Sequence, residues 1–139
     1  MQQRSLVLIL ARDLADKLAT AMFVVDHEGT LVFFNEMAGQ ILGKTFSDVG
    51  PLRLEQWIDA FSPVGLDGKR LSTDELALVV AYRERRPSHH ELKIRGLDDE
   101  ERHLAVTALP LFARTDEFVG AAAIFWEVQP EDAGFEGSS

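Results

Sequence analysis

The chain has 139 residues, enough for one domain with its own hydrophobic core and too few for two domains of ordinary size. It contains 23 acidic and 14 basic residues, and the resulting net charge of −9 argues against a nucleic-acid partner. Because cysteine is absent, disulfides, thiolate metal sites, thiol nucleophiles and cysteinyl cofactor adducts are excluded.

The N-terminal segment predicts an amphipathic helix over residues 5–20, because apolar residues recur at helical spacing and charged residues lie mostly on the other side. Its apolar run, residues 6–11, is far shorter than the roughly 20 residues of a membrane span. No signal-peptide cleavage site follows it, so we expect a cytoplasmic protein without a membrane segment. The apolar stripe of this helix consists of Leu6, Val7, Leu10, Leu14 and Leu18.

Residues 22–26 and 30–35 predict a β-hairpin that leads directly into a short helix. Both runs are rich in β-branched and aromatic residues, and a glycine-containing turn separates them. Asn35 can accept a hydrogen bond from an amide two or three residues further on, which makes it the predicted N-cap of the helix. Gly43 supplies the left-handed residue at which this helix is expected to end.

The middle of the chain predicts two further helices. Residues 53–61 place their large apolar side chains, Trp57 among them, on one helical face. Ser72 and Glu75 form a capping box that starts a helix reaching about residue 86, just before a proline.

The remaining segments predict three strands in antiparallel succession, at residues 89–96, 102–112 and 118–128. A single antiparallel sheet with the helices packed across one face would bury both kinds of element. The chain is therefore expected to divide into an N-terminal flanking helix at 1–20, a domain at 21–128 and a disordered polar tail at 129–139.

The segment DHEGTLVFFNEMAGQILG, residues 26–43, resembles the signature pattern of the PAS domain family. The positions of that pattern are occupied by Asp26, Gly29, Leu31, Asn35, Ala38 and Gly43. Near the C-terminus, a strand ending in Pro-Leu, a polar turn, Val-Gly and a final apolar strand are similar to the last hairpin of signalling PAS domains. The resemblance runs from about residue 14 to residue 128.

The resemblance implies an α+β fold: a five-stranded antiparallel sheet in the order 2-1-5-4-3, with short helices across one face over a small cavity. It also implies a sensor and dimerisation module of bacterial signal transduction, without catalysis. The family's frequent Asp-Ile-Thr ending is replaced here by Glu127-Val128-Gln129-Pro130. The chain therefore looks like a stand-alone PAS protein or a piece of a larger one.

The expected interior offers almost no charge, which favours a lipid-like or aromatic small molecule as ligand. The expected pocket residues are Ile41, Trp57, Leu76, Val80, Leu92, Ile94, Val106 and Ile124. Large residues from the helices could equally fill this space, which would leave a purely structural domain. Ligand identity and any signalling partner stay open at this point.

Cofactor alternatives differ in how well the residues support them. The family's haem-binding members supply a histidine from the long helix, and residues 73–86 contain none. His89 and His90 are adjacent on a strand and point to opposite faces, so no metal site is expected. A non-covalent flavin in a redox-sensing domain stays open, because Trp57, Tyr82 or Trp126 could stack on its ring.

Enzymatic motifs are absent: the sequence has no phosphate-binding glycine loop, no nucleophile elbow and no zinc-binding helix motif. The remaining enzyme hypothesis is a small α+β protein whose cavity holds a carboxylate–histidine pair. Glu91 with His103 is the pairing that neighbouring strands allow. If both side chains face solvent, this hypothesis fails, and we expect no catalytic residues.

The N-terminal helix predicts a homodimer, because a continuous apolar stripe is uncommon on the surface of a soluble monomer. Small residues at 120–123 would let the helix approach the last strand, with Phe125 filling the groove beside it. The alternative is a helix that only covers the sheet of its own monomer.

Overall fold

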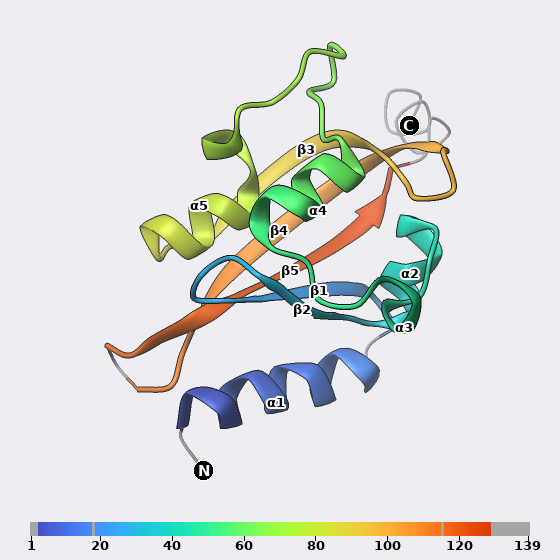
Figure 1. The fold of residues 1–139 in the computed structure, drawn as a ribbon. Helices are drawn as coiled ribbons and strands as arrows, with labels where there is room; N and C mark the ends of the chain where they lie inside the picture. Colours follow the sequence, from blue (N-terminus) through green and yellow to red (C-terminus); the bar gives the residue numbers. More distant parts are fainter. Residues whose placement is uncertain (1–2, 18, 115, 129–139) are drawn as a thin grey trace, which may run out of the picture.

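The computed structural model describes residues 3–17, 19–114 and 116–128 (Figure 1). The N-terminal half contains α1 (Gln3–Lys17), β1 (Ala21–Asp26), β2 (Leu31–Phe34), α2 (Glu36–Leu42), α3 (Phe46–Val49) and α4 (Leu54–Phe61). The C-terminal half contains the 3-10 helix η1 (Thr73–Glu75), α5 (Ala77–Glu84), β3 (Ser88–Arg95), β4 (Glu101–Phe112) and β5 (Phe118–Glu127). The polar tail expected at 129–139 lies outside the described residues.

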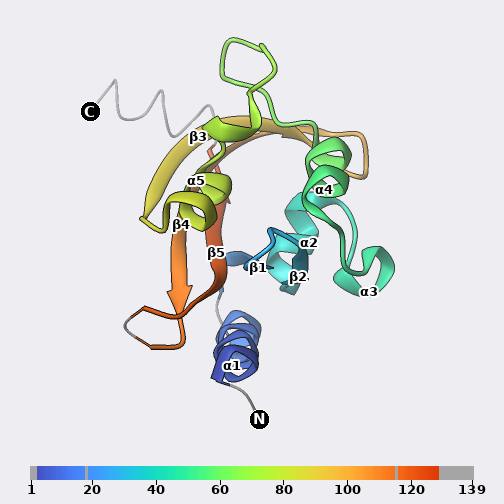
Figure 2. The same ribbon diagram turned by 60° about the vertical axis from the view of Figure 1, so that its left-hand side comes forward.

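The strands form one antiparallel sheet in the order β2-β1-β5-β4-β3, so the predicted fold class and strand order are confirmed. Figure 2 shows the sheet curving around α5 and α4 on its concave side, whereas α1 lies on the other side of the sheet. The sheet therefore has an inner face under α2–α5 and an outer face that α1 covers in part, where Ala11 packs against residues of β1, β2 and β5.

Alternation along β5 assigns each residue to one of these faces. Ala123 and Phe125 belong to the inner core, whereas Ala122 and Ile124 pack in the outer cluster. This is the period of two that a β-strand imposes on its side chains. Two distinct hydrophobic clusters thus share a single central strand.

Asn35 joins the hairpin to the inner helices. Its Oδ1 accepts hydrogen bonds from the backbone N–H of Met22 at 3.0 Å and of Ala38 at 2.9 Å. Its Nδ2 donates to the carbonyl of Thr20 at 2.9 Å. The side chain therefore caps α2, as predicted, and also fixes the start of β1 beside that cap.

The helix expected from residue 72 to about 86 is interrupted, which corrects the sequence expectation. The Glu75 carboxylate accepts from both the N–H and the hydroxyl of Ser72, closing a single 3-10 turn. Leu76 then adopts an extended conformation, and α5 begins only after it. The break turns Leu76 inward, where it is buried in the core.

Candidate ligand pocket

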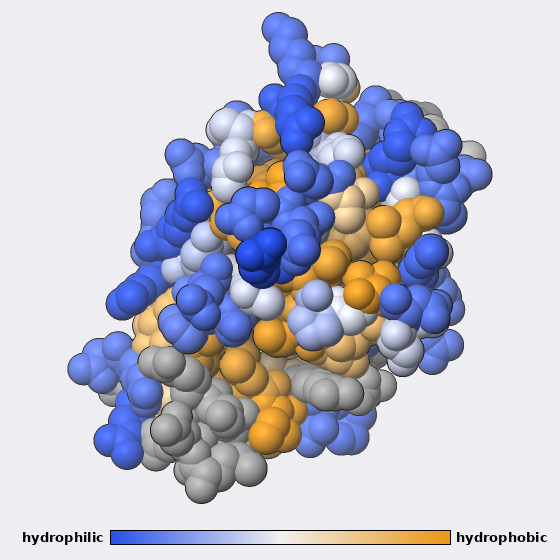
Figure 3. Space-filling model, viewed as in Figure 1, coloured by the Kyte–Doolittle hydropathy of each residue, from blue (hydrophilic) through white to orange (hydrophobic). Residues whose placement is uncertain are grey.

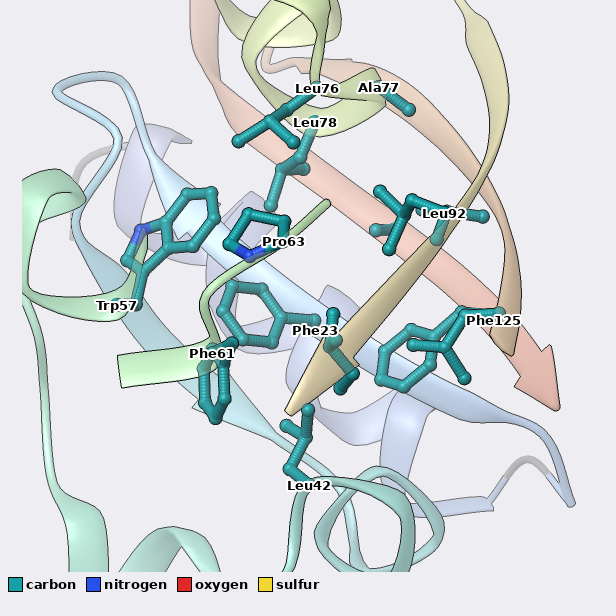
Figure 4. Close-up of a pocket in the computed structure, with 14 residues that line it drawn as sticks. Phe23, Leu42, Trp57, Phe61, Pro63, Leu76, Ala77, Leu78, Leu92 and Phe125 are labelled. Carbon is teal, nitrogen blue, oxygen red and sulfur yellow. The ribbon is translucent and has the colours of Figure 1, made fainter. Parts of the chain in front are cut away.

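A cavity of about 80 Å³ lies between the inner face of the sheet and the helices (Figure 4). Every side chain around it is hydrocarbon apart from one indole nitrogen, because the helices and strands each turn their apolar face inward. The lining consists of Phe23, Leu42, Trp57, Phe61, Pro63, Leu76, Ala77, Leu78, Leu92, Ile94, Leu104, Val106, Ala123 and Phe125.

Three interlocked aromatic rings form one wall of the pocket. The ring of Phe23 meets Trp57 edge-on, with centroids 5.4 Å apart, and meets Phe61 in the same way at 6.2 Å. On its far side Phe23 stacks on Phe34, with an interplanar angle of 9°. The spacing along α4 places Trp57 and Phe61 on one helical face, so β1 and α4 hold each other in register.

The turn between β1 and β2 packs against this aromatic wall. The indole N–H of Trp57 donates to the carbonyl of Gly29 at 2.9 Å, so it is already satisfied by the protein. Gly29 has a φ of +84°, and a Cβ placed there would lie 3.0 Å from the Tyr82 ring. The turn therefore lies between α4 and α5 and fits there only with glycine.

At the opposite end of the pocket, the β3–β4 hairpin is hydrogen-bonded to the end of α2. The carbonyl of Leu42, at the end of α2, accepts from the N–H of Leu97 at 2.7 Å. Next to it, Arg102 forms two hydrogen bonds with the Asp98 carboxylate, at 2.8 and 3.0 Å. The Arg102 guanidinium is the main cause that lowers the pKa of Asp98 from 3.8 to about 2, so this ion pair is present at neutral pH.

A family model described as the PAS fold matches residues 15–133. The chain belongs to the PAS fold family. No curated protein matches it in sequence.

Solved structures similar to this PAS domain share the fold at low sequence identity. The Rhodobacter sphaeroides LOV protein has a TM-score of 0.68 and 17% identity, covering 99% of this chain and 74% of that one. A PAS domain from Colwellia psychrerythraea has a TM-score of 0.62 and 14% identity, over 88% and 97%. The light-state dimer of the fungal blue-light photoreceptor Vivid has a TM-score of 0.59 and 12% identity, over 78% and 77%.

The structure places five of the eight expected pocket residues around the cavity: Trp57, Leu76, Leu92, Ile94 and Val106. Ile41 packs against the inner core without lining the cavity, and Val80 is a partly buried residue of α5 outside the lining. Ile124 lies in the outer cluster, because it alternates with the inward-facing Ala123 and Phe125. Contact of any of these residues with a ligand stays a prediction.

Several lining residues were missed from the sequence. Phe125 was expected beside the N-terminal helix, but it points into the pocket of the PAS domain instead (Figure 4). Leu104 could have been found from its register, because it pairs with Leu92 across β3 and β4. Phe23 lies on a strand whose residues are buried on both faces, so alternation of polar and apolar residues did not mark its direction.

Glu91 and His103 are paired, but on the wrong face for catalysis in the cavity. His103 Nε2 lies 3.0 Å from Glu91 Oε1, and the side chains are 31% and 47% exposed, respectively. Their strand neighbours Leu92 and Leu104 point inward, so this pair faces outward. The cavity-enzyme hypothesis built on this pair therefore fails its own geometric requirement.

Flavin and haem do not fit the pocket of this PAS domain as it stands. Pockets for molecules of drug size are about 300–1,000 Å³, several times the volume here. Of the three aromatic residues considered for stacking, only Trp57 lines the cavity, and no histidine does. Within the described part of the chain, no group of three or more histidines or acids could hold a metal ion.

Helix α1 covers the outer face of the sheet and also leaves apolar residues exposed. Ala11 is buried against Met22 and Val24, while Leu10 and Leu14 are 56% and 53% exposed. Figure 3 shows hydrophobic surface on the lower part of the molecule, where Figure 1 places α1. Of the other expected stripe residues, Val7 is partly buried, and the side chains of Leu6 and Leu18 lie outside the described residues.

Proposed function

We propose that this PAS domain is a cytoplasmic sensor that binds a small apolar molecule in its inner pocket and catalyses no reaction. The observation that carries the proposal is the lining: 14 side chains from strands and helices converge on one cavity, and none offers a free polar group. Binding there would draw its free energy from apolar surface removed from water, at roughly 25 cal/mol per Å². No described helix is long and apolar enough to cross a membrane.

We further propose that the domain acts as a homodimer that uses α1, and that the dimer passes its signal to a partner protein. Leu10 and Leu14 lie one helical turn apart and together form an apolar strip that the domain's own sheet does not cover. A two-fold dimer that pairs these strips would remove them from water while leaving Ala11 packed on the sheet. One protein with a similar fold, the fungal photoreceptor Vivid, was solved as a dimer. Its similarity to this chain concerns the fold alone.

Mass spectrometry of the purified protein tests the ligand proposal. The protein would be measured under native and denaturing conditions, together with an absorbance scan from 300 to 700 nm (about the range of flavin and haem bands). An absorbance scan without visible bands is the expected result, and a mass excess that disappears on denaturation would reveal a ligand retained through purification. Absorbance bands of a flavin or haem would overturn the proposal, because such a group requires a larger and more polar pocket.

A further inference from the structure

The pocket is unsuited to water. A buried water typically needs two to four polar partners, whereas cavities lined by leucine, isoleucine and phenylalanine stay dry. The one polar hydrogen among the lining side chains, on the indole of Trp57, is donated to the carbonyl of Gly29. An occupant of this pocket must therefore be apolar over its whole surface.

The volume limits the occupant further. A dry cavity of about 150 Å³ with a similar lining binds benzene, which has six carbon atoms. The cavity here is about 80 Å³, roughly half of that. At the same number of atoms per unit of cavity volume, this pocket accommodates about three to four non-hydrogen atoms.

The walls resist expansion. Phe23 is held by edge contacts with Trp57 and Phe61 and by stacking on Phe34, so none of these rings can swing aside alone. At the other end, the backbone bond between Leu42 and Leu97 fixes the end of α2. Close-packed interiors of this kind do not yield to an extra ring without displacing backbone.

We propose that the pocket selects a wholly apolar molecule of about three to four non-hydrogen atoms, such as a short hydrocarbon or a dissolved gas, and rejects aromatic rings and lipid chains. This inference rests on the proposed sensor function and narrows its ligand class. It replaces the lipid-like or aromatic ligand expected from the sequence, because the sequence alone does not give the volume of the pocket.

The test uses three probes of graded size on the full chain with carbon-13 labelled methyl groups. Xenon gas under pressure, benzene and decanoic acid would each be titrated while methyl resonances are followed by NMR. Xenon is expected to shift the methyl signals of Leu78, Leu92 and Val106 saturably, because all three line the pocket. Benzene and decanoic acid are expected to leave these signals unchanged.

A matched pair of variants tests the role of volume. Leu78→Ala enlarges the pocket and should admit benzene, whereas Ile124→Ala removes a similar side chain from the outer cluster and should still exclude it. If Leu78→Ala fails to fold, Leu92→Ala serves the same purpose. Ala123→Val fills the pocket from β5 and should abolish the xenon-induced shifts.

The outcomes separate the inference from the function on which it rests. If benzene or decanoic acid shifts the pocket methyl signals of the wild-type protein, the size limit is wrong and the sensor proposal stands. If none of the probes shifts them, both proposals fail. If xenon still shifts them in Ala123→Val, it binds elsewhere and the inference is overturned.

Discussion

At the scale of single residues, two polar side chains stabilise the ends of elements around the pocket. Asn35 satisfies backbone groups of both β1 and α2, and it is buried, so no water can replace it. Asp98 holds Arg102 at the hairpin next to the end of α2. Both residues belong to turns or caps, and both stabilise the frame around the pocket.

Replacing Asn35 with alanine should lower the free energy of unfolding by about 2–3 kcal/mol, because a cap is lost and buried amides are left unsatisfied. Urea denaturation followed by circular dichroism would measure this. Thr45→Ala is the control, since the exposed Thr45 hydroxyl caps the four-residue α3 by accepting from the N–H of Asp48 at 3.3 Å and donating to the Asp48 carboxylate at 3.0 Å. An equal or smaller effect at Asn35 than at Thr45 would contradict the account.

Asp98 should contribute a pH-dependent part of the stability. Its pKa is lowered from 3.8 to about 2, so its contribution is present above pH 3.8 and is lost as the pH falls towards 2. The melting temperature of Asp98→Asn should therefore lie below that of the wild type at pH 6, and the difference should shrink between pH 4 and pH 2. A difference in melting temperature that stays constant from pH 6 to pH 2 would contradict this account.

At the scale of elements, the order of helices and strands could be predicted apart from the four-residue α3, whereas the faces of the central strand could not. On β3 one face is exposed to solvent, so the alternation of polar and apolar residues correctly predicts that Leu92 and Ile94 point inward. β5 is buried on both faces along most of its length, so nothing in FVGAAAIFWE distinguishes Ile124 from Phe125. The break at Leu76 was also hidden, because a capping box starts a 3-10 turn and an α-helix equally well.

Helix α1 should determine the oligomeric state. The wild-type protein should sediment as a dimer, and the double variant Leu10→Asp, Leu14→Asp should sediment as a folded monomer, because charges at both positions would lie in the proposed interface. Leu66→Asp is the matched control: Leu66 is 49% exposed in the loop between α4 and η1, away from α1, and this variant should remain dimeric. A wild-type protein that is monomeric at micromolar concentration would show that α1 only caps its own sheet.

At the scale of the whole molecule, the net charge of −9 opposes self-association, and the apolar strip on α1 favours it. Repulsion between two such molecules is felt over a Debye length of about 30 Å at 0.01 M salt and about 10 Å at 0.1 M. Added salt therefore weakens the electrostatic repulsion between the two molecules. It leaves the free energy gained by burying apolar surface almost unchanged.

Dimerisation should consequently strengthen as sodium chloride is raised from about 0.01 to 0.3 M, which sedimentation equilibrium would measure as a falling dissociation constant. The Leu10→Asp, Leu14→Asp variant should remain monomeric throughout this range. Association that weakens with salt would instead point to ion pairs between the subunits.

The sharing of β5 between two hydrophobic clusters has a consequence for sequence change. Ala121, Ala122 and Ala123 are buried in succession, and neighbouring members face opposite clusters. An added methyl group at Ala123 enters the pocket, and one at Ala122 presses towards α1. This stretch therefore has no exposed side, and a larger residue at any of these three positions disturbs either the pocket side or the α1 side of the sheet.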